Sequence, residues 1–331
     1  MLRLFGSSSP LTLLLIIIYA GALGLPWLLH PVEVSSTWPG FFGGVLSDRT
    51  HVQWQCSGLL CALVTLVVLC VQGIFISLLA QRYKILAEAG MIPAVLYITI
   101  YVLFAENGIP TLELFLNFIL IWLLFRLFGI YNRQKADSIY FDAGLMNGLL
   151  AFMYFPAILF SVFSFYALFR LKPTTFREIV IWLSGILCVF FLGGTLLFWF
   201  HRTDLFLQTH VRFRNADTSW DTFFDNRTLV ASVITGLLFL SALGFLAMRF
   251  STNLIQVRRY LGASLMFVLF SVAVILVHPE PMAKTVAFAA IGMSMLIGHF
   301  LSGLRRRLYA DITFAAFMLS AFILQYVIFA S

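Results

Sequence analysis

Basic residues recur between long apolar runs, and this alternation constrains the fold more than any other feature of the sequence. When the apolar runs are threaded back and forth as membrane-spanning helices, 15 of the 21 Lys and Arg residues fall on alternate connections, on one side of the membrane. Basic residues are retained on the cytoplasmic face, so this side is predicted to be cytoplasmic. The fifteen are Arg3, Arg82, Lys84, Arg126, Arg133, Lys135, Arg170, Lys172, Arg177, Arg249, Arg258, Arg259, Arg305, Arg306 and Arg307.

The composition excludes a soluble globular protein. Apolar residues make up 61% of the chain and charged residues 11%, and the mean hydropathy is +0.98, whereas a soluble domain is a little under half apolar. A span needs about 20 apolar residues, so spans account for most of the length and leave no room for a separate soluble domain. The net charge of +7 lies in short clusters at helix ends, which indicates membrane lipids rather than nucleic acid as partners.

The sequence therefore predicts an all-α, polytopic transmembrane bundle that forms a single integral membrane domain over residues 1–331, with about eleven spans. The N-terminus is expected in the cytoplasm and the C-terminus in the periplasm. We interpret 10–29 as the first span rather than as a signal peptide. The predicted spans are 10–29, 57–80, 91–105, 110–129, 139–154, 156–171, 178–200, 229–248, 260–277, 283–303 and 311–330.

The stretch 139–171 decides the orientation of everything that follows it. Pro156 lies in its middle, where proline removes a helical hydrogen bond and disfavours helix at the preceding residue. We expect two short helices that turn at 154–156. A single kinked helix would place Arg258, Arg259 and the 305–307 cluster on the outer side, so the distribution of charge favours two helices.

Two long polar loops are predicted on the outer side, at about 30–56 and 201–228. In the first, Glu33 or Asp48 could act as a general base on an incoming hydroxyl. The alternative is a solvated loop without chemistry. If the two loops contact each other, they cover a cavity on the outer side of the membrane that opens to the outer leaflet.

The second loop carries the candidate site for a lipid phosphate. Its basic residues include Arg202, His210, Arg212 and Arg214, and an arginine fork grips phosphate through two parallel hydrogen bonds. The alternative is that these charges pair with the aspartates of the same loop and with ordinary lipid headgroups. No metal site and no resident cofactor are expected; a polyprenyl-phosphate lipid is the possible substrate.

Ionisable residues within spans are costly and are functional candidates by default. Glu113 and Asp142 are predicted near span ends, close enough to the interfaces to be solvated, and Arg126 or Lys135 could pair with Asp142. His299 is expected to be a hydrogen-bonded core residue. The four cysteines lie in or beside apolar runs and are expected to be buried free thiols. They are Cys56, Cys61, Cys70 and Cys188.

Two segments carry a family resemblance. The opening Met1–Phe5 with the following Ser-Ser-Ser-Pro, and the middle of the chain, resemble an uncharacterised multi-pass inner-membrane family of Bacteroidota. The middle match includes Phe141-Asp142-Ala143-Gly144, Tyr154-Phe155-Pro156, Phe169-Arg170-Leu171-Lys172-Pro173 and Phe176-Arg177-Glu178. This resemblance implies residence in the bacterial inner membrane and assigns no activity.

A more distant resemblance is to the multi-pass, GT-C type glycosyltransferases that use polyprenyl phosphate. The segment Gly144–Arg177 and the two outer loops are similarly placed. This resemblance implies sugar transfer at the outer leaflet, with Glu33 or Asp48 as the base and Arg202, Arg212 and Arg214 on the phosphate. Two hypotheses stay open beside it: a non-catalytic membrane subunit of an envelope, secretion or motility complex, and a transporter or flippase.

Overall fold

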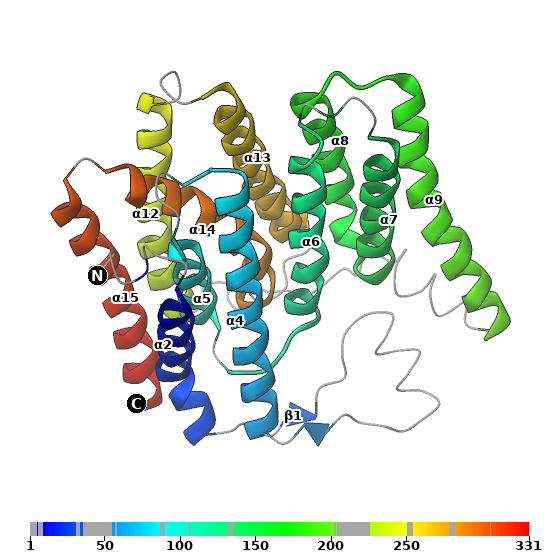
Figure 1. Ribbon diagram of the computed structural model, residues 1–331. Coiled ribbons are helices and arrows are strands. Elements are labelled where there is room, and N and C mark those ends of the chain that lie inside the picture. The colour runs from blue at the N-terminus through cyan, green and yellow to red at the C-terminus, as the bar shows by residue number, and fades with distance from the viewer. Residues whose placement is uncertain are drawn as a thin grey trace.

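The computed structural model is an all-helical bundle apart from one short strand pair (Figure 1). It describes residues 5, 9–30, 34–35, 55–56, 58–86, 90–105, 107–131, 133, 136–201, 203, 226–249, 254–277, 282–304 and 306–330. The strands β1 (Val34–Ser35) and β2 (Gln55–Cys56) pair antiparallel. They close the connection between the first two helices of the bundle.

The described residues form eleven α-helices, and each corresponds to one predicted span. The largest shift is at α13, which begins at Ile255 rather than at 260. The helices are α2 (Pro10–Leu29), α4 (Gly58–Arg82), α5 (Ile92–Phe104), α6 (Leu112–Phe128), α7 (Asp137–Met153), α8 (Leu159–Leu171), α9 (Phe176–Trp199), α12 (Asn226–Arg249), α13 (Ile255–Val277), α14 (Met282–Gly303) and α15 (Arg307–Ala330).

Seven helices in the described chain are long and apolar enough to cross a membrane: α2, α4, α9, α12, α13, α14 and α15. The remaining four are shorter. At 1.5 Å per residue, the 13 residues of α5 cover about 20 Å, against about 30 Å of hydrocarbon. The all-helical bundle is confirmed, and its seven long apolar helices are consistent with an integral membrane protein. The count of eleven crossings stays a prediction.

The chain reverses at Pro156, as the sequence predicts. Helix α7 ends at Met153, a short 3₁₀ turn (η1, Phe155–Ile158) follows, and α8 runs back along α7. Ser164 Oγ donates a hydrogen bond to Asn147 Oδ1 at 3.1 Å, which joins residues on opposite sides of the turn. The two short helices are therefore an antiparallel hairpin and not one kinked helix.

One end of the bundle, which we call the basic end, gathers the helix termini that carry arginine. Arg82 and Arg126 lie in the last turns of α4 and α6. Contacts between elements show that these termini share one end: Arg259 donates to the Leu171 carbonyl at 3.1 Å, and Arg177 pairs with Asp137 at 3.1 Å. The opposite end carries the α5–α6 turn, where Thr65 donates to the Gly108 carbonyl at 3.0 Å. The helices therefore alternate in direction as the distribution of charge predicts.

Helix α5 is the centre of the bundle, and every one of its residues is buried. It packs against α2, α4, α12, α14 and α15. A chain of hydrogen bonds crosses its middle: Asn117 donates to Tyr97 Oη at 3.0 Å, and Tyr97 donates to Gln72 Oε1 at 2.6 Å. Asn117 also donates to the Ala287 carbonyl at 2.9 Å. Four helices are thus tied together by polar groups that no water reaches.

The C-terminus of α5 is capped by a buried arginine. Arg227, in the first turn of α12, is 6% exposed. Its guanidinium donates to the carbonyls of Val102, Leu103 and Ala105 at 3.0, 3.3 and 2.6 Å. These are carbonyls that a helix end leaves without partners, and a cation there also suits the helix dipole. We expected Arg227 in an outer polar loop that reached 228; instead α12 begins at Asn226 and takes it into the core.

Helices α7 and α9 pack closely because glycines line their contact. A Cβ atom on Gly185 of α9 would lie 2.5 Å from the Phe141 carbonyl oxygen, and one on Gly148 of α7 would lie 3.0 Å from the Ile186 carbonyl oxygen. Small residues in this arrangement let two membrane helices approach at the backbone. The other side of α9 is apolar and exposed, for example at Leu187 and Phe191, as expected of a helix that faces lipid.

One cysteine expectation is wrong. Cys61, in the first turn of α4, is disulfide-bonded. Cys70 is free and buried as expected, whereas Cys188 is free but only partly buried. The side chain of Cys56 lies outside the described residues. The pattern of apolar neighbours indicates burial and says nothing about the oxidation state. Cys61 lies at the end of the bundle opposite the basic end.

Candidate functional site

The residues that the sequence favours for chemistry lie outside the described chain. They are Glu33, Asp48, Arg202, His210, Arg212 and Arg214. Their predicted roles, as a general base and as a lipid-phosphate site, therefore stay predictions. The candidate site that the structure does define lies at the basic end of the bundle.

A cavity of about 710 Å³ lies between α4 and α6 at the basic end. We call it the α4–α6 groove. Both helices stand side by side near the middle of the molecule, with α7, α8 and α9 beyond α6 (Figure 1). The walls of the groove are apolar and largely aromatic, and its basic lining comes from three arginines, Arg82, Arg126 and Arg133. The apolar lining includes Phe75, Leu78, Phe118, Trp122, Phe125 and Ile139.

The groove is about one leaflet deep. Phe75 precedes Arg82 by seven residues on α4, and Phe118 precedes Arg126 by eight on α6. At 1.5 Å per residue, these separations correspond to about 10 and 12 Å. Half of the hydrocarbon core of a bilayer is about 15 Å thick. An apolar chain lying along the groove would thus place a polar headgroup among the arginines.

An aromatic cluster fixes the two helix ends that form the groove. Tyr83 follows the last residue of α4, and its hydroxyl donates to the Phe125 carbonyl on α6 at 2.9 Å. Its ring packs edge-on against Phe128 and Tyr260, with centroids 5.5 and 5.2 Å away. Tyr260 in turn donates to the Phe128 carbonyl at 3.2 Å. Two carbonyls of the last turn of α6 are therefore satisfied by tyrosines, which position this turn against α4 and α13.

The three arginines surround this tyrosine. Burial raises the pKa of Tyr83, and the positive charges of Arg82, Arg133 and Arg126 oppose that rise. Because burial dominates, the phenol stays neutral and keeps its hydrogen bond to α6. The same three charges that act on Tyr83 line the groove, so they form one cationic cluster there.

Of the three arginines that line the groove, Arg126 is the most firmly held. Its guanidinium pairs with Asp142 of α7 at 3.1 Å and lies over the Trp122 ring, 5.7 Å from the centroid. Its Nε atom is buried and has no hydrogen-bond partner among the described residues. The sequence analysis allowed either Arg126 or Lys135 as the partner of Asp142, and the structure pairs Asp142 with Arg126. Arg82 and Arg133 are exposed and form no ion pair with the described residues.

The chemistry of the groove suits binding. Arginine stays protonated at any physiological pH, so it serves as a donor and a charge and not as a general base. A guanidinium offers a planar fork that matches phosphate or carboxylate oxygens. An apolar chain with an anionic end therefore complements the groove in both shape and charge.

From the sequence, these arginines are predicted to be topogenic charges, with Arg126 also a possible partner of Asp142, and the groove is not predicted. A local signal was present: Trp122 precedes Arg126 by one helical turn, which places an aromatic face beneath a guanidinium at a helix end. What the sequence could not supply is the pairing of the α4 and α6 termini around Tyr83.

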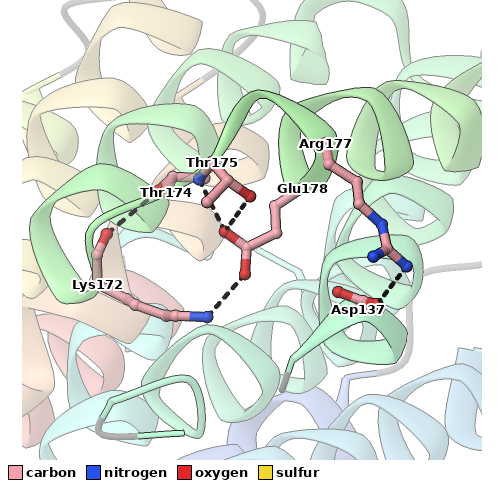
Figure 2. Close-up of polar contacts among 6 residues, drawn as sticks. All are labelled: Asp137, Lys172, Thr174, Thr175, Arg177 and Glu178. Atoms are coloured by element: carbon pink, nitrogen blue, oxygen red, sulfur yellow. Dashed lines mark hydrogen bonds and ion pairs between the residues drawn. The ribbon is translucent and has the colours of Figure 1, made fainter. Parts of the chain in front are cut away.

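A second polar cluster lies at the basic end, in the turn between α8 and α9 (Figure 2). Glu178 accepts hydrogen bonds from the Thr175 backbone N–H at 2.8 Å and from its hydroxyl at 3.1 Å. The same carboxylate pairs with Lys172 at 2.7 Å. This is a capping box that begins α9. Arg177, the neighbour of Glu178, points away toward Asp137 (Figure 2). The cluster satisfies its own donors and acceptors, so its role is to hold the turn.

Two further ionisable residues lie within the helices, and the structure confirms the expectation for one of them and contradicts it for the other. His299 is 8% exposed, and its Nδ1 donates to the Ile85 carbonyl at 2.6 Å. It is therefore a hydrogen-bonded core residue, as predicted. Glu113, which was expected to be solvated near the interface, is instead 2% exposed in the first turn of α6, so that expectation is wrong.

Comparisons with known proteins supply no relative. No family model, no curated protein and no solved structure matches the chain.

Proposed function

We propose that this multi-pass membrane protein binds a lipid with an anionic phosphate headgroup in the α4–α6 groove. The observation that carries the proposal is the cluster of Arg82, Arg126 and Arg133 around Tyr83, at the end of an apolar groove one leaflet deep. An acyl or isoprenoid chain would lie along Phe75 and Phe118. Its phosphate would meet the guanidinium forks, which form charge-assisted hydrogen bonds with phosphate oxygens.

We further propose that the basic end faces the cytoplasm of a bacterial inner membrane. Two independent features support this orientation. Arginines concentrate at this end, as the positive-inside rule requires. The disulfide-bonded Cys61 lies at the opposite end, and disulfides persist on the oxidising, periplasmic side. The lipid would then enter from the cytoplasmic leaflet.

Native mass spectrometry of the protein in detergent, titrated with phosphatidylglycerol, tests lipid binding. We expect bound lipid, and we expect Arg82→Gln combined with Arg133→Gln to weaken binding by roughly tenfold, because two exposed ion pairs contribute up to about 1 kcal/mol each. Arg170→Gln is the matched control, since Arg170 is an exposed arginine at the same end but outside the groove. An equal loss of lipid binding in the control and in the double variant would show that the groove is not the binding site.

Sugar transfer from polyprenyl phosphate is a finer proposal that rests on residues outside the described chain. Glu33 or Asp48 would take a proton from the acceptor hydroxyl, and Arg202, Arg212 and Arg214 would hold the phosphate. The support is the resemblance to GT-C type enzymes together with the placement of the outer loops. Transfer of labelled sugar in membranes tests this proposal: if Glu33→Gln and Asp48→Asn together leave transfer unchanged, the assignment of the base is wrong.

A further inference from the structure

We infer that the α4–α6 groove prefers lipids whose headgroup is a phosphate monoester over lipids whose phosphate is a diester. This inference rests on the proposed lipid-binding function and deepens it. The ligand class includes phosphatidic acid and polyprenyl monophosphate, which share a terminal phosphate group. Phosphatidylglycerol, whose phosphate carries two ester bonds, stands for the other class.

The balance of charge in the groove carries the inference. Three arginines line the groove, and one carboxylate, that of Asp142, offsets the charge of one of them, Arg126. Two positive charges, on Arg82 and Arg133, are left without an ion pair in the described part of the chain. A phosphate monoester carries about −1.5 to −2 charges at pH 7, whereas a diester carries only one negative charge. The monoester therefore matches the remaining charge of the groove.

The number of guanidinium hydrogen-bond donors in the groove also favours a phosphate monoester. A monoester presents three strong acceptor oxygens, one more than a diester. Arg82 and Arg133 are both exposed and free to turn toward a headgroup. Arg126 also lines the groove, although one of its terminal nitrogens is held by Asp142. The third phosphate oxygen of a monoester can therefore accept a hydrogen bond from a third guanidinium, that of Arg126.

Asp142 limits the affinity of the groove for any anionic lipid. Its carboxylate occupies a guanidinium nitrogen that a phosphate oxygen would otherwise take, at 3.1 Å. Half-exposed pairs of this kind are weakly held, so a headgroup can compete for the arginine. Neutralising Asp142 raises the charge of the groove from two to three, and it should favour the singly charged diester as well as the monoester.

A competition experiment tests the preference. Full-length protein in detergent is mixed with equimolar phosphatidic acid and phosphatidylglycerol of identical acyl chains, and bound species are counted by native mass spectrometry. We expect phosphatidic acid to be favoured by roughly fivefold, the upper range for one additional exposed ion pair. Arg82→Gln should reduce the ratio toward one while the protein still binds both lipids. Arg170→Gln should leave the ratio unchanged.

A second pair of variants tests the role of Asp142. Asp142→Asn should strengthen binding of phosphatidylglycerol by roughly threefold to fivefold. Asp137→Asn is the matched control, because Asp137 forms an ion pair of the same 3.1 Å length with Arg177, which does not line the groove. A parallel competition between phosphatidic acid and a polyprenyl monophosphate tells which chain type the apolar walls prefer.

The outcomes separate the two proposals. Binding of both lipids at a ratio near one overturns the preference and leaves lipid binding intact. Binding of neither lipid, in wild type and in every variant, overturns the proposed function. An unchanged affinity in Asp142→Asn contradicts the competition for Arg126.

Discussion

The guanidinium of Arg227 donates a hydrogen bond to Gln325 Oε1 at 2.7 Å, which joins the first turn of α12 to α15 beside the C-terminus of α5. The same nitrogen donates to the carbonyls of Val102 and Ala105. One side chain therefore connects three helices that are far apart in the sequence. In an apolar interior, each of these acceptors would be costly to leave without a donor.

Replacing Arg227 should destabilise the protein more than any change in the exposed arginines. We expect Arg227→Met to lower the free energy of unfolding by about 2–4 kcal/mol, since it leaves several buried carbonyls without a donor. Arg227→Lys should cost less, because it keeps the charge and loses the fork. Thermal unfolding in detergent gives the comparison. A stability of Arg227→Met equal to that of Arg170→Gln would show that the cap is dispensable.

The hydrogen-bond chain through the centre of α5 should contribute measurably but modestly. Tyr97→Phe removes the hydroxyl that donates to Gln72 and accepts from Asn117. Interhelical hydrogen bonds in membranes average about 0.6 kcal/mol and reach about 1.7. We therefore expect a loss of roughly 1–2 kcal/mol.

The control for this change is Tyr166→Phe, because the Tyr166 hydroxyl has no hydrogen bond with the described residues. A double-mutant cycle of Tyr97→Phe with Gln72→Leu isolates the pair. A coupling energy of zero would contradict the network.

The glycine contact between α7 and α9 should not tolerate a side chain. Gly185→Ala places a methyl group 2.5 Å from the Phe141 carbonyl oxygen, so the two helices must move apart. Gly194→Ala, on the same helix, meets nothing within 4 Å, and should be neutral or stabilising by up to about 1 kcal/mol. Thermal unfolding of the two variants decides the point: equal stability would mean that α9 does not pack tightly on α7.

The proposed orientation can be tested by labelling single cysteines from outside the cell. Asn107 lies in the α5–α6 turn and Ser138 in the first turn of α7, and both are exposed at opposite ends of the bundle. In a background with all four native cysteines replaced by serine, a membrane-impermeant maleimide should reach Asn107→Cys in intact cells whose outer membrane is permeable. Ser138→Cys should react only after lysis. The reverse pattern would place the basic end outside.

The helices were predictable because each property that fixes them is local. An apolar run of the right length, a basic terminus and a proline at 156 are visible in the sequence, and each has one physical consequence. The α7–α8 hairpin follows from Pro156 together with the requirement that later arginines face one side. The helix starts are less certain from sequence: α13 begins before 260, because Arg258 and Arg259 extend the helix beyond its apolar part.

The groove and the arginine cap were not predictable because both depend on which helices become neighbours. Arg82 and Arg126 are 44 residues apart in the sequence and look alike as helix-end charges. Only the packing around Tyr83 brings them into one cluster. From the sequence, Arg227 likewise looks like a residue of a polar loop. Its burial depends on α5 carbonyls that lie more than a hundred residues earlier in the sequence.

The burial of α5 on all sides has a consequence for biosynthesis. Its neighbours α12, α14 and α15 are translated long after it, so residues 92–104 must wait in the bilayer or translocon with their polar groups only partly matched. The carbonyls at its C-terminus gain their guanidinium only when residue 227 emerges, and Gln325 joins later still. A chain that stops before α15 would therefore leave uncovered the side of α5 that packs against α15. The quality-control proteases of the membrane could recognise this exposed surface as the sign of an incomplete protein.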